Sequence, residues 1–151
     1  MFQKIEKAMQ HRADLLASGQ IGELVKHYLY PLVLYLGEQQ KVVDGPDEMV
    51  GIFKELQQDH QSRGVTHLVA EVVAMDLPRQ GRFRAWVSYH EKGVDLSNLS
   101  RRDVVHYCRG TEQGILTEMV EYDHCAIPQI WQKPKPARKV LAQRDNQTLQ
   151  A

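Results

Sequence analysis

The sequence predicts an α+β domain, with helices in its N-terminal half and most strands after them. Over residues 2–17 and about 46–62, apolar residues recur at helical spacing. After residue 64 the period changes to two, and Val, Ala and aromatic residues alternate with polar ones. This change of period indicates helices packed against an antiparallel sheet.

Two helices are predicted before residue 30. The first covers residues 2–17, and Gly19 suits the left-handed position that ends a helix. A second, short helix is predicted from Ile21 to Tyr28, because Pro31 prevents its continuation.

A third helix is predicted at about 46–62. Asp44 is a good capping residue, Pro46 fits the first turn, and the acids that follow lie at the positive end of the helix dipole. Gly64 follows its predicted end.

About six strands are expected, the first two of them short, and a polar loop is predicted at 93–100. The last four form a meander of antiparallel strands. The expected strands are 32–36, 41–43, 65–75, 82–91, 103–109 and 116–123.

Length and charge predict one folded domain, residues 1–131, followed by a basic tail rich in Pro and Gln at 132–151. The chain has 151 residues and a net charge of +0. The tail holds five basic residues and one acidic residue, so the body carries an excess of acids. An acidic body argues against nucleic acid as a partner of the folded domain.

The N-terminal residues lack the continuous apolar segment of a signal peptide, and the longest apolar run is too short for a membrane span. The two cysteines form no CxxC pair. We therefore predict a cytoplasmic protein with no membrane partner.

Nucleotide-binding and common hydrolase motifs are absent from the sequence. His106, Cys108, His124 and Cys125 are residue types that bind zinc, but they lack the short paired spacings of a zinc site. No metal and no cofactor are predicted.

Several local motifs resemble the nuclear transport factor 2-like superfamily, in its SnoaL-like and ketosteroid-isomerase-like branch. The resemblance covers roughly residues 5–127 and depends on the order of the motifs. They are Leu15 to Gln20 with Leu24 and Tyr28, then Asp44 to Glu48, and finally Gly114 to Asp123.

The resemblance implies a cystatin-like cone, in which a strongly curved sheet closed by helices surrounds a hydrophobic pocket. It also implies a homodimer formed through the outer sheet face. The first-helix tyrosine and the general-base aspartate of ketosteroid isomerase fall at about Arg12 and Leu36. A leucine cannot abstract a proton, so that specific reaction is not expected.

The last hairpin suggests a proton-transfer site. If Gly110 pairs with Ile115, then Cys108 lies opposite Thr117, His106 opposite Met119 and Val104 opposite Glu121. Strand alternation places Asp123 on the same face. Our hypothesis is that His106 transfers protons and that Glu121 or Asp123 orients it. Burial and the nearby charge would move the pKa values of the histidine and the carboxylate toward neutrality. The same residues also fit a buried core histidine and a solvated Glu121, and a register shift of one residue would move the whole set outward.

Aromatic residues suggest a lining for a small hydrophobic ligand. The candidate ligand-binding residues are Tyr28, Tyr30, Trp86 and Met119, with Tyr35 close by in sequence. Core and dimer packing also account for these aromatic side chains.

Two functions follow from this pattern. One is a cone protein that binds a small hydrophobic molecule and catalyses cofactor-free acid–base chemistry, such as isomerisation, dehydration, cyclisation or epoxide opening. The other is a non-catalytic ligand-binding or protein-interaction domain of the same fold. An enclosed pocket with at least two polar groups, His106 among them, favours the first. A pocket filled by Tyr, Met and Leu side chains favours the second.

Overall fold

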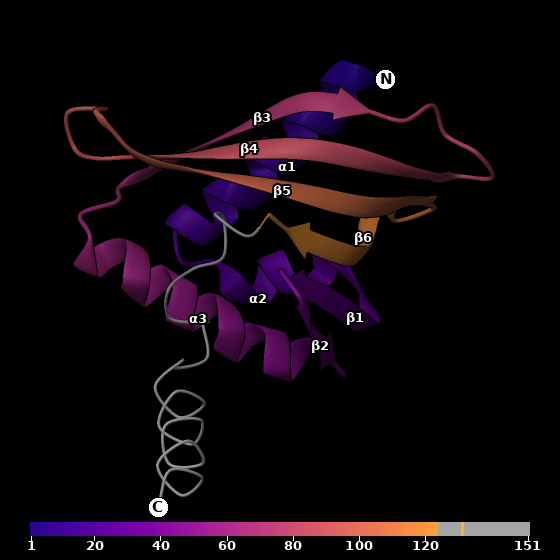
Figure 1. The fold of residues 1–151 in the computed structure, drawn as a ribbon, viewed down its shortest axis with the longest axis horizontal. Helices are drawn as coiled ribbons and strands as arrows, with labels where there is room; N and C mark the ends of the chain where they lie inside the picture. The colour runs from indigo at the N-terminus through magenta and orange to yellow at the C-terminus, as the bar shows by residue number, and fades with distance from the viewer. Residues whose placement is uncertain (124–130, 132–151) are drawn as a thin grey trace, which may run out of the picture.

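The computed structural model describes residues 1–123 and Trp131. Figure 1 shows the fold. Its helices are α1 (Phe2–Ala17), α2 (Ile21–Leu24), a 3-10 turn η1 (Val25–His27) and α3 (Pro46–Ser62). Its strands are β1 (Tyr28–Leu36), β2 (Gln39–Val43), β3 (His67–Met75), β4 (Arg82–Lys92), β5 (Asn98–Thr111) and β6 (Gly114–Tyr122). The predicted α+β class is confirmed.

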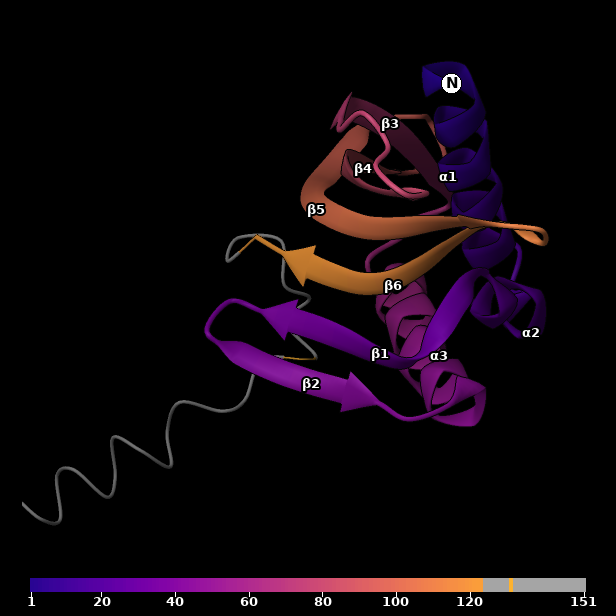
Figure 2. The ribbon, with the colours of Figure 1, turned by 90° about the vertical axis from the view of Figure 1, so that its right-hand side faces the viewer.

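The six strands form one sheet in the order β2-β1-β6-β5-β4-β3. The sheet is strongly curved but not closed, and Figure 2 shows α1 and α3 on the same side of it. Strands β1 and β6 run parallel, while the other neighbours are antiparallel. The prediction of an antiparallel sheet was wrong for this one pair, because β1 lies beside β6, the last strand of the meander, and both strands run in the same direction.

Helix α1 ends as the sequence predicts. The N–H of Gln20 donates to the Leu15 carbonyl at 2.8 Å, and the N–H of Gly19 donates to the Leu16 carbonyl at 3.2 Å. This double hydrogen bond requires the left-handed backbone of Gly19, whose φ is +78°. The turn directs the chain into α2.

Two local predictions were wrong. The second helix ends at Leu24, and the strand that follows begins at Tyr28 and includes Pro31. Pro31 has no N–H for the ladder, and the register between β1 and β6 shifts where it lies. The polar loop predicted at 93–100 also ends earlier, because Asn98 and Ser100 pair with the end of β4.

The core lies between the helices and the concave face of the sheet. Apolar residues of α1, α3 and the strands are buried together there. Gln10 of α1 also holds the outer edge of β3, since its side chain accepts from Ala70 N–H at 2.8 Å and donates to the Leu68 carbonyl at 2.9 Å. These bonds keep α1 against the far side of the cone.

No helix within the described residues is long and apolar enough to cross a membrane. The predicted tail, together with His124 and Cys125, lies outside the described residues. The domain limits and the cytoplasmic location stay predictions.

Candidate functional site

A cavity of about 70 Å³ lies inside the cone, between α1, α2, α3 and the concave face of the sheet. We call it the cone cavity. Much of its wall is apolar, with side chains such as Leu16, Leu24 and Phe53. Polar groups interrupt that wall, and they are Arg12, His60, Tyr89, Glu91, Arg102 and His106, with the rings of Tyr28 and Tyr122 beside them.

The first polar group of the wall is a tyrosine–histidine pair. Tyr89 extends from β4 and His106 from β5, and the Tyr89 hydroxyl lies 2.7 Å from Nε2 of His106. His106 is almost completely buried. Burial raises the pKa of Tyr89 well above its ordinary value. The tyrosine therefore stays protonated at neutral pH and can give a hydrogen bond.

His106 continues into a second set of contacts. Its Nδ1 lies 3.4 Å from Oγ1 of Thr117, a fully buried residue of β6. Nη1 of Arg12, from α1, donates to the same oxygen at 2.5 Å. A guanidinium, a hydroxyl, an imidazole and a phenol thus form one chain of hydrogen bonds, which ends at Tyr89.

The charge of His106 follows from these neighbours. Burial, and then the positive charge of Arg12, lower the pKa of His106 from 6.5 to about 3. The imidazole is therefore neutral at physiological pH. We predicted a pKa for His106 that moves toward neutrality because a carboxylate was expected beside it. In the structure, the charged group that acts on this ring is the cation Arg12.

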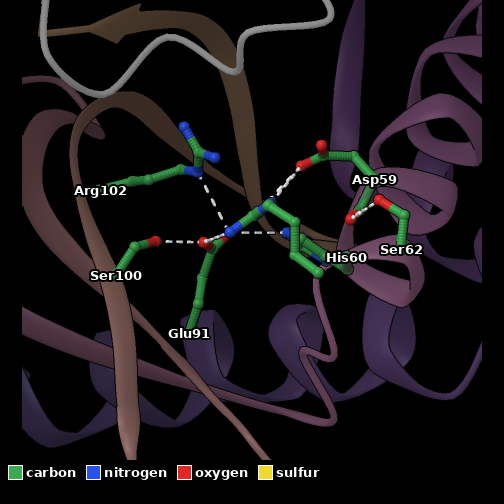
Figure 3. A network of polar contacts seen from close by, with 7 residues as sticks. Asp59, His60, Ser62, Glu91, Ser100 and Arg102 are labelled. Carbon is green, nitrogen blue, oxygen red and sulfur yellow. Dashed lines mark hydrogen bonds and ion pairs between the residues drawn. The ribbon is translucent and has the colours of Figure 1, made fainter.

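The second polar group is the buried carboxylate of Glu91, which follows two residues after Tyr89 on β4 and is drawn in Figure 3. Oxygens of Glu91 accept from His60 at 2.8 Å, Arg63 at 2.9 Å and Arg102 at 3.1 Å, and also from the hydroxyl of Ser100. Glu91 is only 1% exposed. The end of α3 is thereby joined to β4 and β5.

The ionisation of Glu91 depends on these donors. Burial by itself would raise the pKa of this carboxyl, but the hydrogen bonds from His60, Arg63 and Ser100 outweigh burial and hold its pKa below the usual range. Glu91 is therefore an anion whose oxygens are already occupied by donors, which makes it a poor proton acceptor for a ligand.

The structure does not bring Glu121 and Asp123 to His106. The predicted pairs Gly110–Ile115 and Cys108–Thr117 are present, but a bulge follows them in the ladder. His106 pairs with Val120 instead of Met119, and Val104 pairs with Tyr122 instead of Glu121.

The bulge reverses the faces of the residues beyond it. Glu121 is exposed on the outer face, where it accepts from the Tyr107 hydroxyl at 3.2 Å. Asp123 is exposed after the end of β6, and its N–H donates to the Asp103 carbonyl at 3.3 Å.

One of the four candidate ligand-binding residues lines the cone cavity. That residue is Tyr28, whose ring lies 5.3 Å from the Arg12 guanidinium carbon. Tyr30 and Met119 lie in a separate surface groove, and the Tyr30 hydroxyl donates to the Val25 carbonyl at 2.7 Å. Trp86 is on the outer face, stacked against Arg84 at 4.8 Å.

Tyr89, Glu91 and Arg12 were missed as site residues. Tyr89 and Glu91 continue the alternation of Phe83, Ala85 and Val87 along β4, so the period of two already placed them on the inner face. Arg12 shares the apolar face of α1. A charged residue at a core position was the available signal.

Within residues 1–123 and 131, no group of three His, Cys, Asp or Glu side chains could hold a metal ion. His106 and Cys108 both contact Thr117, the thiol at 3.9 Å. Leu36, near which the sequence resemblance places the isomerase base, is a buried apolar residue of β1.

The fold and its cone cavity define a class, an α+β cone with helices inside a curved sheet. No family model matches the sequence. No curated protein matches it either.

Solved structures do match. The chain is similar to a nuclear transport factor 2-like protein of unknown function from Shewanella oneidensis MR-1, at 12% identity and a TM-score of 0.62, over 80% of this chain and 96% of that one. It is also similar to a ketosteroid isomerase-like protein from Erwinia carotovora atroseptica, at 14% identity and a TM-score of 0.57, over 80% and 93%. A third is a Catenulispora acidiphila protein solved in complex with S-DNPA, at 17% identity and a TM-score of 0.57, over 82% and 94%. The chain therefore has the nuclear transport factor 2-like fold, as the resemblance in its sequence predicted.

Proposed function

We propose that the cone cavity binds a small molecule through an oxygen atom and promotes cofactor-free acid–base chemistry on it. The 2.7 Å contact between Tyr89 and His106 carries this proposal, because it places a polarised hydroxyl on a wall that is apolar over much of its area. A donor in such a setting stabilises charge that develops on a ligand oxygen.

The direction of the hydrogen bonds supports Tyr89 as the donor to the ligand. Because Thr117 accepts from Arg12, its own hydrogen is available for Nδ1 of His106. The neutral ring then carries its hydrogen on Nε2 and donates to the Tyr89 oxygen. This leaves the Tyr89 hydrogen for a ligand carbonyl or hydroxyl oxygen in the cavity.

The polar groups on the cavity wall also favour acid–base chemistry over a cavity that is filled by its own side chains. His106 and several other polar groups lie on its wall. Isomerisation, dehydration and related reactions need such a donor at an oxygen. The size of about 70 Å³ restricts the ligand to a few non-hydrogen atoms.

One observation favours a second candidate, non-catalytic binding. Glu91 is the one carboxylate among the described residues of the wall, and donors from four residues occupy its oxygens. A ligand that needs proton abstraction would have to use water or a group of its own as the base.

Acetone is a suitable probe, since it is small and carries one carbonyl. Titration followed by NMR is expected to shift the His106 ring signals in a saturable way. Tyr89→Phe should weaken binding about fivefold to tenfold, the effect of losing one hydrogen bond of ordinary strength. Tyr35→Phe is the matched control, because Tyr35 does not line the cavity.

Exchange of acetone protons for deuterium in D2O separates the two candidates. Faster exchange with the wild-type protein than in buffer, lost in Tyr89→Phe, is expected for acid–base chemistry. Binding without faster exchange would select the non-catalytic reading, and no binding at all would refute the proposal.

We also propose that two copies pair through the outer sheet face. That face has a wide groove with Val73, Trp86 and Val105 on its wall, and Val73 is 59% exposed. Light scattering should give twice the chain mass of 17.4 kDa, and Trp86→Glu should reduce it to a single copy. A wild-type monomer at micromolar concentration would contradict pairing.

A further inference from the structure

Arg12 is a buried cation in the wall of the cone cavity. It is 2% exposed, although it belongs to an otherwise apolar helix face. Its two terminal nitrogens donate to the Thr117 hydroxyl and, at 2.8 Å, to the Ile115 carbonyl. Its remaining nitrogen, Nε, is buried and has no hydrogen-bond partner among the described residues.

The groups around Arg12 are uncharged. They are a hydroxyl, a carbonyl and the ring of Tyr28. None of the ion pairs found in residues 1–123 and 131 involves Arg12. A buried charge is costly unless an opposite charge or a full set of hydrogen bonds accompanies it.

The other arginine of the wall differs in this respect. Arg102 donates to Glu91, and so does the neighbouring Arg63. Since this carboxylate is shared among several donors, it is not available to Arg12. Apart from its histidines, the wall carries two arginines and one carboxylate, so its permanent charges are more positive than negative.

We propose that Arg12 binds the carboxylate of a small aliphatic acid inside the cone cavity. The inference rests on the proposed ligand-binding function and names the class of ligand. A carboxylate supplies the missing anion, and its oxygens accept the charge-assisted hydrogen bonds that a guanidinium offers. The apolar wall receives the alkyl part, and Tyr89 remains as a donor to a further oxygen.

The volume sets the length of this acid. A cavity of about 150 Å³ holds benzene in another protein, and the cone cavity has about 70 Å³. An acid of roughly two to four carbons fits this space without movement of the wall. Propionate is therefore a suitable probe, and propionamide is an uncharged molecule of nearly the same shape.

The experiment compares the two probes by NMR titration at constant ionic strength. Propionate is expected to bind the wild-type protein at least tenfold more tightly than propionamide. Arg12→Met should abolish this preference, and Arg12→Lys should keep part of it. Arg84→Met is the control, because Arg84 is on the outer face and pairs with Asp76, and it should retain the full preference.

Each outcome has a distinct meaning. Equal binding of the two probes to the wild-type protein would overturn the carboxylate assignment and leave the proposed function standing. A preference that survives Arg12→Met in a folded variant would also overturn it. If acetone binds and propionate does not, the assignment fails alone, whereas failure of both probes refutes the proposed function as well. The comparison of probes on the wild-type protein needs no variant, so it still tests the carboxylate assignment if Arg12→Met does not fold.

Discussion

Replacing Glu91 with alanine is expected to lower the free energy of unfolding by about 3–5 kcal/mol. The carboxylate is buried and accepts from His60, Arg63 and Arg102. Its removal takes away the buried anion that these three donors share. The loss of such an anion costs more than the loss of an exposed ion pair, which is worth about 0–1 kcal/mol.

Urea unfolding at pH 7.5 measures this effect. Glu71→Ala is the matched control, since Glu71 lies on the neighbouring strand, is 58% exposed and pairs with His90. We expect the control to change the unfolding free energy by less than about 1 kcal/mol. A loss below about 1 kcal/mol for Glu91→Ala would contradict the structural role assigned to the carboxylate.

Acidification is expected to destabilise the protein through His106, beginning at pH 6.5. The pKa of this ring falls from 6.5 in the unfolded chain to about 3 in the fold, because of burial and the charge of Arg12. Below pH 6.5 the unfolded chain binds a proton that the folded protein does not. Stability is therefore complete above pH 6.5 and decreases by up to about 1.4 kcal/mol per pH unit, until the pH reaches the folded pKa.

The window from pH 6.5 to 4.5 isolates the histidine contribution. Glu91 also favours the fold at higher pH, but its effect begins only below 4.5, the ordinary pKa of this carboxyl. We expect His106→Gln to remove most of the slope of stability between pH 6.5 and 4.5. His27→Gln is the control, since the pKa of His27 is also lowered by burial and by Arg12, but this side chain is only partly buried.

Urea unfolding at several pH values within this window gives the slope. An unchanged slope in His106→Gln would show that the ring is not buried in its neutral form. The chain of hydrogen bonds from Arg12 to Tyr89 would then need a different arrangement.

The helices were predictable because their signals are local. The apolar period of 2–17 and the start of α3 at Pro46 agree with the structure. The prediction of Asp44 as the cap was wrong, because Gly45 is the N-cap residue and no side chain among the described residues caps the helix. The parallel pairing of β1 with β6 was not predictable in this way, since it depends on contacts between residues far apart in the chain. Asn98 and Ser100 are polar, so the start of β5 lacks the alternation of apolar and polar residues from which a strand is predicted.

The candidate site was predicted in part. His106 was selected, and the structure places it on the wall of the cone cavity. Its expected partners were displaced by one bulge near Thr117, a backbone irregularity that strand alternation cannot anticipate. The inner-face position of Tyr89 could be predicted from the alternation along β4. The contact of Arg12 with Thr117 could not, because it depends on how α1 packs on the sheet.

The proposed binding site is the cone cavity, with Arg12 and Tyr89 on its wall. A crystal structure of the protein soaked in propionate is the decisive experiment. We expect density for the acid in the cavity, with its carboxylate against the Arg12 guanidinium and its alkyl chain against Leu16 and Leu24. A cavity that holds only water, or that is filled by the side chains of its own wall, would refute binding at this site.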